Sequence, residues 1–499
     1  MSERSSGILL PVYALPSPHG VGTMGRAAFE FIDFLAAAHQ RWWQILPIGP
    51  TGYGDSPYQS LSTFAGNPYF IDLDLLEADG LLTAAEIAAA EAPDLARVDY
   101  GALYRTRPPL LRRAAERLLA REPGAAEDFA AAQPWVRDWA LFSALKSHFG
   151  GAAWTAWEED IRLRQPEALA RYRALLARET ALETAVQLLF DRQWTALRAY
   201  AAEKGVKILG DLPFYVAPDS ADVWAEPRFF ALDAHGRSTA VAGVPPDYFS
   251  ADGQLWGNPL YDWDAMAADG YGWWIRRIAG AQRRFDAVRI DHFRGFARYW
   301  AVPAGAESAR EGAWLPGPGM ALLGVLNGWF PDLKFIAEDL GVLTPEVPEL
   351  REECGWPGMR VLQFAFDPDG DGAYLPHSYE RNCLCCTGTH DNTTLAAWVG
   401  EVSDRERAFA QRYLGVPAHR LREALLRAGL GSVADYFFAQ MQDYLALGAP
   451  ARTNTPGTAQ GNWQWRLAPG QLTAAKAAEI AALTALYRRS APAEKEETK

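Results

Sequence analysis

The feature that most constrains the fold is a series of short apolar runs separated by stretches of helical sequence. Six of these runs end in or beside a glycine, a proline or an acid, at residues 43–47, 206–211, 285–291, 334–338, 360–366 and 383–387. Buried parallel strands have near-continuous apolar sequences of this kind. Repeated alternation of strand and helix over such a length favours a (β/α)8 barrel over an open sheet. The sequence therefore predicts an α/β fold, a (β/α)8 TIM barrel with no C-terminal β-sandwich domain.

Two stretches depart from this alternation and are interpreted as insertions. Residues 80–190 are rich in Ala, Leu, Arg and Glu, with helix starts and no clear strand, which predicts a helical insertion docked on the barrel. Residues 225–275 are Trp-rich and strand-poor, and we expect them to line a cleft. Residues 1–489 would then form one catalytic barrel, and the charged tail at 490–499 is expected to be disordered.

The charge balance narrows the classes of partner. Lys and Arg number 48 against 61 Asp and Glu, which gives a net charge of -13 and argues against nucleic acid or an anionic membrane surface as a partner. No apolar run approaches the roughly 18 residues of a membrane helix, and four cysteines are too few for a disulfide framework. We expect a cytoplasmic protein that is a monomer or a weak dimer.

Aromatic residues make up 12% of the chain, including 19 tryptophans. Core filling explains most of them, because aromatic side chains bury large areas. The alternative is a binding platform, since a flat ring matches the apolar face of a sugar or a base. The acidic net charge disfavours a base, so carbohydrate is the first candidate ligand.

Four acids stand at or just after the ends of the expected strands: Asp211, Asp291, Glu338 and Asp391. In a (β/α)8 barrel the carboxyl ends of the strands converge on one face, where catalytic groups lie. Gathering carboxylates there costs free energy through like-charge repulsion. Cleavage of an acetal bond needs such a cluster, because one acid protonates the leaving oxygen while a carboxylate attacks the anomeric carbon. The alternative, a helix N-cap role, explains one such acid more easily than four.

The neighbours of these acids strengthen the catalytic interpretation. Arg289 and Asp291 are two residues apart, so they lie on the same side of a strand, where a guanidinium keeps a nucleophilic carboxylate ionised. His390 precedes Asp391 in a polar loop suited to binding sugar hydroxyls. The apolar residues that flank Glu338 favour a raised pKa, which a general acid requires.

Six stretches in this order resemble the 4-α-glucanotransferase family (amylomaltase, or disproportionating enzyme), within the α-amylase clan. The resemblance extends from about residue 7 to about residue 488. The stretches are GDSPYQS at 54–60, GDLPFYV at 210–216, GVPPDYFS at 243–250, QLWGNP at 254–259, RIDHFRG at 289–295 and NTPGT at 454–458.

The resemblance implies a role for each acid. Asp291 would be the nucleophile that forms a covalent glucosyl-enzyme, Glu338 the general acid and later the base, and Asp391 the residue that stabilises the transition state. Asn462 would form part of the cleft wall. Together with it, the substrate-binding residues would be Tyr58, Asp211, Trp256, Arg289, His292 and His390.

The same resemblance places individual subsites. Tyr58 would stack on the sugar in subsite -1, His292 would lie near the +1 sugar, and Trp256 would line the acceptor side. Tyr53 and Tyr100 fall where some relatives have a second, remote glucan-binding patch. Core packing is the alternative for these two tyrosines.

The implied activity is transfer of α-1,4-glucan segments from a donor to the 4-hydroxyl of an acceptor glucan or glucose, by retaining double displacement. Whether cycloamyloses also form is left open. Because hydrolysis shares the first chemical step, a retaining α-glucan hydrolase remains an alternative, as does a non-catalytic glucan-binding protein. The expected partners are α-1,4-glucans and malto-oligosaccharides.

A transferase must exclude water, and one loop is a candidate lid. Its glycine would serve as a hinge, its two prolines as stiffeners and its aromatic residues as a hydrophobic cap; a plain surface turn is the alternative. The lid candidates are Gly243, Pro245, Pro246, Asp247, Tyr248 and Phe249.

No cofactor and no metal are expected. Cys383, Cys385 and Cys386 lack a His pair at ligand spacing and are interpreted as buried free thiols. The acidic stretch 367–372 resembles half of a calcium loop, but Ser378 stands where an EF-hand has its Glu. There is no Walker phosphate loop and no dinucleotide-binding fingerprint.

Overall fold

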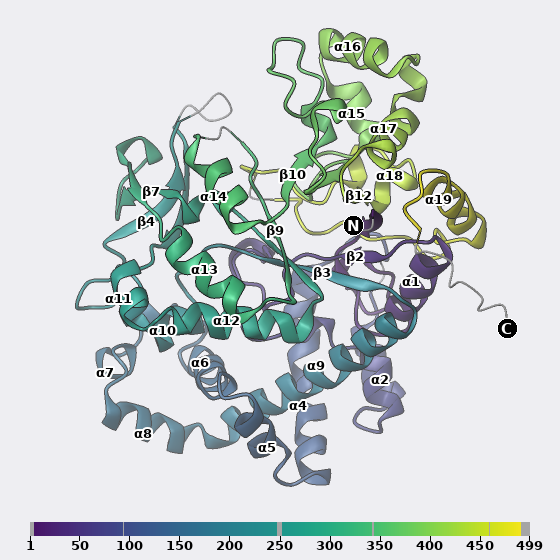
Figure 1. Cartoon of the computed structure of the whole chain (residues 1–499). Helices are drawn as coiled ribbons and strands as arrows, with labels where there is room; N and C mark the ends of the chain where they lie inside the picture. Colours follow the sequence, from purple (N-terminus) through teal and green to yellow (C-terminus); the bar gives the residue numbers. More distant parts are fainter. Residues whose placement is uncertain (1–3, 93, 247–251, 342–343, 459, 491–499) are drawn as a thin grey trace, which may run out of the picture.

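Eight parallel strands form the centre of the computed structural model, which describes residues 4–92, 94–246, 252–341, 344–458 and 460–490 (Figure 1). Neighbouring strands of the barrel follow one another in the chain, and the eighth pairs with the first. Between β9 and β10 the backbone N–H of Ala337 donates to the carbonyl of Pro357 at 2.8 Å, which brings the two edges together. The strands are β1 (Ser5–Leu9), β2 (Trp42–Gln44), β3 (Lys207–Leu212), β6 (Ala287–Ile290), β9 (Lys334–Ala337), β10 (Gly358–Val361), β11 (Cys383–Cys386) and β12 (Tyr436–Gln440).

This arrangement confirms the predicted (β/α)8 barrel. The described residues after β12 form no further strand of a sheet, so the expected absence of a C-terminal sandwich agrees with the fold. The strand expected at 360–366 was predicted to be too long. β10 ends at Val361, and a 3-10 helix at Leu362–Phe364 follows it directly. β1 and β12 were not predicted from the apolar runs.

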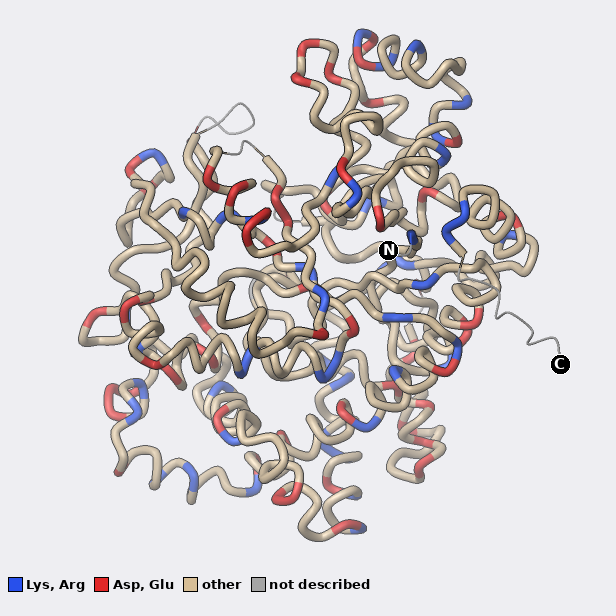
Figure 2. The backbone as a smooth tube through the Cα atoms, viewed as in Figure 1, with Lys and Arg blue, Asp and Glu red and all other residues tan. Residues whose placement is uncertain are grey.

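Helices cover the outside of the barrel (Figure 1). α9 (Ala177–Glu203) ends before Gly205, whose φ of +70° turns the chain towards β3. No helix in the described part of the chain is both long and apolar enough to cross a membrane. Figure 2 shows acidic and basic residues interspersed over the outer helices. The other barrel helices are α1 (Arg26–Ala37), α2 (Leu73–Ala78), α12 (Gly272–Arg284), α13 (Met320–Trp329), α14 (Glu346–Cys354), α15 (Leu395–Glu401), α16 (Asp404–Leu414), α17 (Leu421–Gly431), α18 (Met441–Tyr444) and α19 (Ala474–Leu486).

The stretch expected to be a helical insertion contains helices and, among its described residues, no strand of a sheet. α3 begins with the capping box of Thr83 and Glu86, in which each side chain accepts a hydrogen bond from the other residue's backbone N–H. The insertion packs on α9 through α4, α5 and α6. Its helices are α3 (Ala84–Ile87), α4 (Tyr100–Arg121), α5 (Ala125–Ala132), α6 (Val136–His148), α7 (Glu159–Arg162) and α8 (Pro166–Leu175).

The stretch 225–275 is not strand-poor, and that expectation was wrong. β4 (Ala240–Val244) and β5 (Gln254–Pro259) form an antiparallel sheet with β7 (Arg298–Pro303) and β8 (Ala313–Pro316), in the order β5-β4-β7-β8. Two of the four strands come from beyond the stretch, so the sheet depends on pairing between distant segments. The helices on either side are α10 (Ala221–Ala225) and α11 (Trp263–Ala268).

The interior of the barrel is filled by inward-facing apolar side chains. Alternate residues of a strand face opposite sides, so Cys386 points into the barrel whereas Cys383 and Cys385 pack in the outer core. All three are buried free thiols, as expected. The barrel interior consists of Trp42, Leu209, Ala287, Ile336, Met359, Val361, Leu384, Cys386, Tyr436 and Phe438.

Candidate active site

The inward-facing positions become charged where the strands reach the carboxyl end of the barrel. Leu209 lies in the interior and Asp211, two residues further along β3, is buried beside Arg289. On β6, Arg289 follows the interior residue Ala287 by two positions, and Asp291 follows Arg289 by two. The period of two along a strand therefore delivers these groups to the mouth, as expected from the spacing.

Arg289 holds two carboxylates at once. Its Nη1 donates to both carboxylate oxygens of Asp211, at 2.8 and 2.9 Å, and its Nη2 lies 2.9 Å from Oδ1 of Asp291. Burial lowers the pKa of Arg289, but Asp211 and Asp291 outweigh this effect and raise it well above its usual value. Burial raises the pKa of Asp211, and the Arg289 guanidinium opposes that rise. Arg289 is therefore a permanent cation that ties β3 to the end of β6.

Glu338 directly follows β9, and its pKa is shifted more than that of an ordinary glutamate. Burial raises its pKa to about 8, Arg289 opposes the rise, and the charge of Asp291 adds to it. The backbone N–H of His292 donates to its Oε2 at 2.7 Å and that of Leu340 to its Oε1 at 3.2 Å. The carboxyl is thus fixed in position and protonated at neutral pH, in agreement with the apolar flanks in the sequence.

Asp391 reaches the mouth from the loop after β11, and its side chain is 44% exposed. His390 Nε2 lies 3.2 Å from its Oδ1, and the Asn454 side-chain amide donates to the same oxygen at 2.5 Å. Arg452 Nη2 donates to the backbone carbonyl of Asp391 at 2.6 Å. A carboxylate held from both its side chain and its backbone, with an open face, is placed to accept hydrogen bonds from a ligand.

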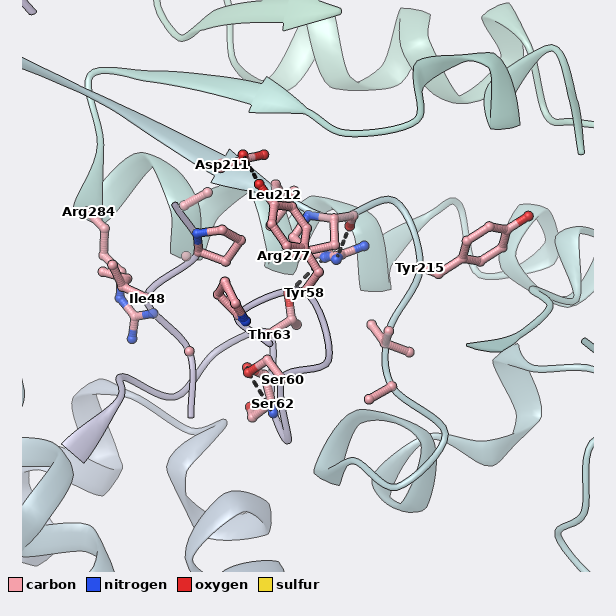
Figure 3. Close-up of a pocket in the computed structure, with 18 of the residues that line it drawn as sticks. Ile48, Tyr58, Ser60, Ser62, Thr63, Asp211, Leu212, Tyr215, Arg277 and Arg284 are labelled. Carbon is pink, nitrogen blue, oxygen red and sulfur yellow. Dashed lines mark hydrogen bonds between the residues drawn. The ribbon is translucent and has the colours of Figure 1, made fainter. Parts of the chain in front are cut away.

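Tyr58 connects the two sides of the mouth. Its hydroxyl donates to Oδ2 of Asp211 at 2.6 Å (Figure 3) and lies 3.1 Å from Nδ1 of His390. Its ring stacks on the His390 imidazole with 4.7 Å between ring centroids and 20° between planes. The ring of Trp463 lies 5.7 Å from that of His390. These contacts fix an aromatic wall beside Asp211.

A cavity of about 300 Å³ opens over these groups. Six of the expected residues line it: Tyr58, Trp256, Asp291, His292, His390 and Asp391. Asp211, Arg289 and Glu338 are not among its lining residues; Asp211 and Arg289 are buried and contact the lining residues Tyr58 and Asp291. A pocket of this size with aromatic walls and a few polar groups is typical of a small-molecule site.

His292 is the most constrained of the lining residues. Its φ of 54° places it in the left-handed region, and its ring meets that of Trp256 edge to face at 4.9 Å. Burial, and to a smaller extent the charge of Arg294, lower the pKa of His292 to about 3, so the imidazole is neutral. Within the described residues its buried Nε2 has no hydrogen-bond partner. The ring of His292 therefore contributes an uncharged surface to the cavity wall.

Three expected residues lie differently. Asn462 is not among the residues that line the cavity: its Oδ1 accepts from the Thr455 N–H at 2.9 Å and its Nδ2 donates to the Thr458 carbonyl at 2.9 Å, so it shapes its own loop. Tyr100 is 8% exposed and its hydroxyl donates to the Trp463 carbonyl at 2.8 Å. That burial supports core packing for Tyr100 over a second glucan patch. The side chain of Tyr53 lies outside the part of the structure that is described.

The lid candidates divide in two. Gly243 lies inside β4, opposite Leu255 of β5 and Trp300 of β7. A Cβ at this position would stand 2.5 Å from the Gln254 carbonyl oxygen. Glycine is therefore required by close approach of two strands, and a hinge at Gly243 would have to break pairing on both sides.

The rest of the loop begins immediately beyond this anchor. Pro245 and Pro246 follow β4, with Pro246 exposed. Asp247, Tyr248 and Phe249 lie outside the described residues, so the cap of the lid stays a prediction.

Several lining residues were not predicted individually, among them Asn454, Trp463, Tyr215 and Gln254. Asn454 and Trp463 come from the loop after α18, Tyr215 from the loop after β3, and Gln254 from β5. Asn454 and Gln254 each open one of the stretches that carry the family resemblance, and Trp463 directly follows Asn462, so sequence signals were present. Within the described ranges, no three His, Cys, Asp or Glu residues are grouped to hold a metal ion.

A buried carboxyl with a raised pKa, Glu338, and a carboxyl paired with a guanidinium, Asp291, satisfy the needs of glycosidic-bond chemistry. Together with the barrel, this site defines a class, the (β/α)8-barrel enzymes that act on glycosidic bonds. The model of the 4-alpha-glucanotransferase family matches residues 10–473, and the chain belongs to that family.

Individual relatives agree over the full length. The chain is 45% identical over 497 residues to a 4-alpha-glucanotransferase of Streptococcus pneumoniae, covering 98% of both chains. It is 46% identical over 499 residues to that of Thermus thermophilus, covering 97% of this chain and 99% of the relative. Among solved structures, the amylomaltase from Streptococcus agalactiae in complex with acarbose matches with a TM-score of 0.95 and 39% identity, over 98% of this chain and 100% of that one. The activity is therefore 4-alpha-glucan transfer, and the hydrolase and binding-protein alternatives are set aside.

Proposed function

We propose that the enzyme transfers α-1,4-glucan segments by double displacement, with Asp291 as nucleophile and Glu338 as acid and base. The observation that carries this assignment is the contrast between the two groups. Asp291 is paired with Arg289 at 2.9 Å, whereas burial raises the pKa of Glu338 to about 8. An ionised nucleophile beside a protonated acid is the ground state that a retaining mechanism requires.

In the first step an Asp291 carboxylate oxygen attacks the anomeric carbon of the donor. The bond from that carbon to the glycosidic oxygen breaks, and Glu338 gives its proton to the departing oxygen, which leaves as the 4-hydroxyl of the shortened chain. In the second step Glu338, now a carboxylate, takes the proton from the 4-hydroxyl of an acceptor. That oxygen attacks the anomeric carbon, and the bond to Asp291 breaks.

The charge coupling between the two groups suits both roles of Glu338. The negative charge of Asp291 contributes to the raised pKa of Glu338. When Asp291 is esterified by the sugar, that charge disappears and the pKa of Glu338 falls. Glu338, the acid of the first step, therefore loses its proton more readily, and its carboxylate can act as the base of the second step.

The remaining site residues are assigned to substrate binding. Asp391 would accept hydroxyls of the sugar being transferred, on the face that His390 and Asn454 leave open. Asp211 and Tyr58 would bind the same sugar from the opposite side. Trp256 and His292 would form the acceptor wall, to which His292 contributes an uncharged imidazole. The S. agalactiae relative binds acarbose, and we assign α-1,4-glucans to this cleft.

Transfer requires that an acceptor at millimolar concentration react with the glucosyl-enzyme in preference to water, which is present at about 55 M. Holding the acceptor in the plus subsites provides a large effective molarity, and closure of the loop after β4 would exclude water. Pro245 and Pro246 limit the conformations of that loop next to a paired strand. We also propose a cytoplasmic enzyme that is a monomer or a weak dimer. Its net charge of -13 argues against nucleic acid or an anionic membrane as a partner.

Incubation with pure maltotriose tests the proposal. Each bond broken in transfer is replaced by one formed, so a ladder of shorter and longer oligomers should appear while the number of reducing ends stays constant. A rising number of reducing ends with only short products would contradict transfer. Closed products without reducing ends, from long amylose, would add cycloamylose formation to the activity.

A further inference from the structure

A second cavity, of about 520 Å³, lies between the helical insertion and the barrel helix α12. Its wall comes from the start of α6, from α10 and from α12, and it shares no residue with the cleft that holds Asp291. At its rim the side chains of Arg276 and Arg283 are 50% and 43% exposed, so the cavity opens to solvent. Its volume lies within the range of small-molecule sites.

One wall of this cavity is a fixed aromatic platform. The ring of Trp135, half-buried, lies nearly parallel to that of Phe64, with 6.3 Å between centroids and 18° between planes. Phe129 meets the same ring edge to face at 6.4 Å. The Trp135 indole N–H donates to Gln133 Oε1 at 3.1 Å, which orients the ring. A flat, oriented indole at the edge of a cavity can stack on the apolar face of a pyranose.

Two buried polar atoms of the lining lack a partner within the described chain. They are the indole nitrogen of Trp139, a residue 5% exposed, and Oδ1 of Asp222, a residue 4% exposed. The other oxygen of Asp222 accepts a hydrogen bond from the Thr63 N–H at 2.8 Å, which fixes the carboxyl. An unpaired buried donor or acceptor destabilises the fold, because it has lost its hydrogen bonds to water. A ligand whose hydroxyl groups both donate and accept would satisfy the two together.

The charges around the cavity select against an anion. Arg276 pairs with Glu226 at 3.0 Å and Arg283 with Asp191 at 2.7 Å, so both guanidiniums of the lining are already engaged. The buried carboxylate of Asp222 would repel a phosphate or a carboxylate ligand. A neutral compound rich in hydroxyl groups fits both the charge and the unpaired atoms.

We infer that this cavity is a second saccharide site, which binds a short segment of α-1,4-glucan by stacking on Trp135 and by hydroxyl contacts with Asp222 and Trp139. The choice of α-1,4-glucan rests on the proposed function. A smaller cavity of about 50 Å³ lies between the two sites (Figure 3): it shares Ser62 with the outer cavity and Tyr58 with the cleft. A long glucan held at the outer site would have a raised effective concentration at the cleft.

Binding to a non-reactive enzyme tests the site directly. Asp291→Asn enzyme titrated with maltotriose should bind one molecule more per chain than the double variant Asp291→Asn/Trp135→Ala, whatever number the cleft itself holds. The matched control is Trp329→Ala, which removes a tryptophan that is 65% exposed on α13 and should leave the number of bound molecules unchanged. Equal numbers in the Asp291→Asn enzyme and the double variant would overturn the inference.

Kinetics on the active enzyme separate a binding role from a folding defect. Trp135→Ala should raise KM for long amylose roughly tenfold, with kcat/KM for maltotriose unchanged, and Trp135→Phe should restore most of the difference by keeping a flat ring. An equal loss on both substrates would contradict a separate site. The inference would also be overturned if the cavity took an apolar ligand. An apolar dye would then bind the wild type but not Trp135→Ala, and maltotriose would not displace it. Failure of the maltotriose ladder with the Trp135-dependent binding intact would count against the proposed function alone.

Discussion

The interior of the barrel and its mouth are built by the same strands and have opposite properties. Leu209, Ala287 and Ile336 face the interior, where the described lining is apolar. Two residues further along the same three strands the side chains are Asp211, Arg289 and Glu338, about 7 Å higher in the barrel. The interior gains free energy by burying apolar surface, whereas the mouth buries charges that repel one another.

This difference separates the residues that hold the fold from those that do the chemistry. Removing an interior side chain should lower the free energy of unfolding and leave the chemistry of the folded enzyme unchanged. Removing a carboxyl from the mouth should abolish or lower activity without lowering stability, because like-charge repulsion and burial oppose its placement there. The following predictions test the separation.

The largest effect is expected for Asp291→Asn. The isosteric amide cannot attack the anomeric carbon, so kcat should fall by about 10⁴-fold or more, while the melting temperature changes little. Steady-state kinetics on maltotriose and a thermal melt measure the two quantities. Asp404→Asn, which alters a 96% exposed acid, is the matched control. Appreciable residual turnover in Asp291→Asn would remove it from the role of nucleophile.

Glu338→Gln should lower kcat on maltotriose by roughly 10²- to 10⁴-fold, because no acid protonates the leaving oxygen. With α-maltosyl fluoride as donor, the rate of the first chemical step in Glu338→Gln should fall far less, since fluoride departs without a proton. Release of fluoride in the first turnover measures that step. Equal losses with both donors would show that Glu338 is not the general acid.

In the interior, Leu384→Ala should lower the free energy of unfolding by about 2–5 kcal/mol, because this fully buried leucine of β11 leaves a cavity. The kcat/KM of the folded enzyme should stay within about twofold of the wild type, if the separation holds. Leu486→Ala, at a 64% exposed position on α19, should change stability by less than about 0.5 kcal/mol. Urea unfolding measures the three proteins. A large loss of kcat with unchanged stability would contradict the separation.

The pH dependence follows from the raised pKa of Glu338, about 8 in the folded enzyme against an ordinary value of 4.5. The acid form is lost above that value, so kcat/KM should fall about tenfold per pH unit on the alkaline side. Between the two pKa values the folded state binds more protons than the unfolded state, so this group lowers stability as pH rises through the window. Glu338→Gln should therefore gain stability relative to the wild type between pH 4 and pH 8.5. A constant difference across that range would contradict the raised pKa.

Much of the barrel could be predicted from sequence, because buried parallel strands require apolar runs. β1 and β12 escaped for physical reasons. β1 begins with Ser5 and Ser6, which are buried but polar. The aromatic run of β12 has no glycine, proline or acid directly after it to mark its end as a strand. The antiparallel sheet escaped because β4 pairs with β7, which lies well beyond it in the chain. Pairing between distant segments leaves little signal in either segment.

The active-site residues also divide into those that the sequence could predict and those that it could not. Asp211, Asp291 and Glu338 could be predicted, since the end of a strand fixes where its next inward-facing residue lies. Asn454 and Trp463 could not be placed, because they reach Asp391 and His390 from a loop whose path depends on tertiary contacts. For Tyr100 the sequence alone does not distinguish a binding role from core packing. In the structure it is buried and its hydroxyl donates to the Trp463 carbonyl, which supports core packing.

Trapping of the glycosyl-enzyme tests the double-displacement account most directly. Glu338→Gln enzyme mixed with α-maltosyl fluoride should accumulate a covalent maltosyl-enzyme, because the fluoride leaves readily and no base assists the second step. Peptide mass spectrometry should find the maltosyl group on Asp291. A maltosyl group on Asp211 or Asp391, or release of fluoride with no covalent adduct at any time, would contradict the account.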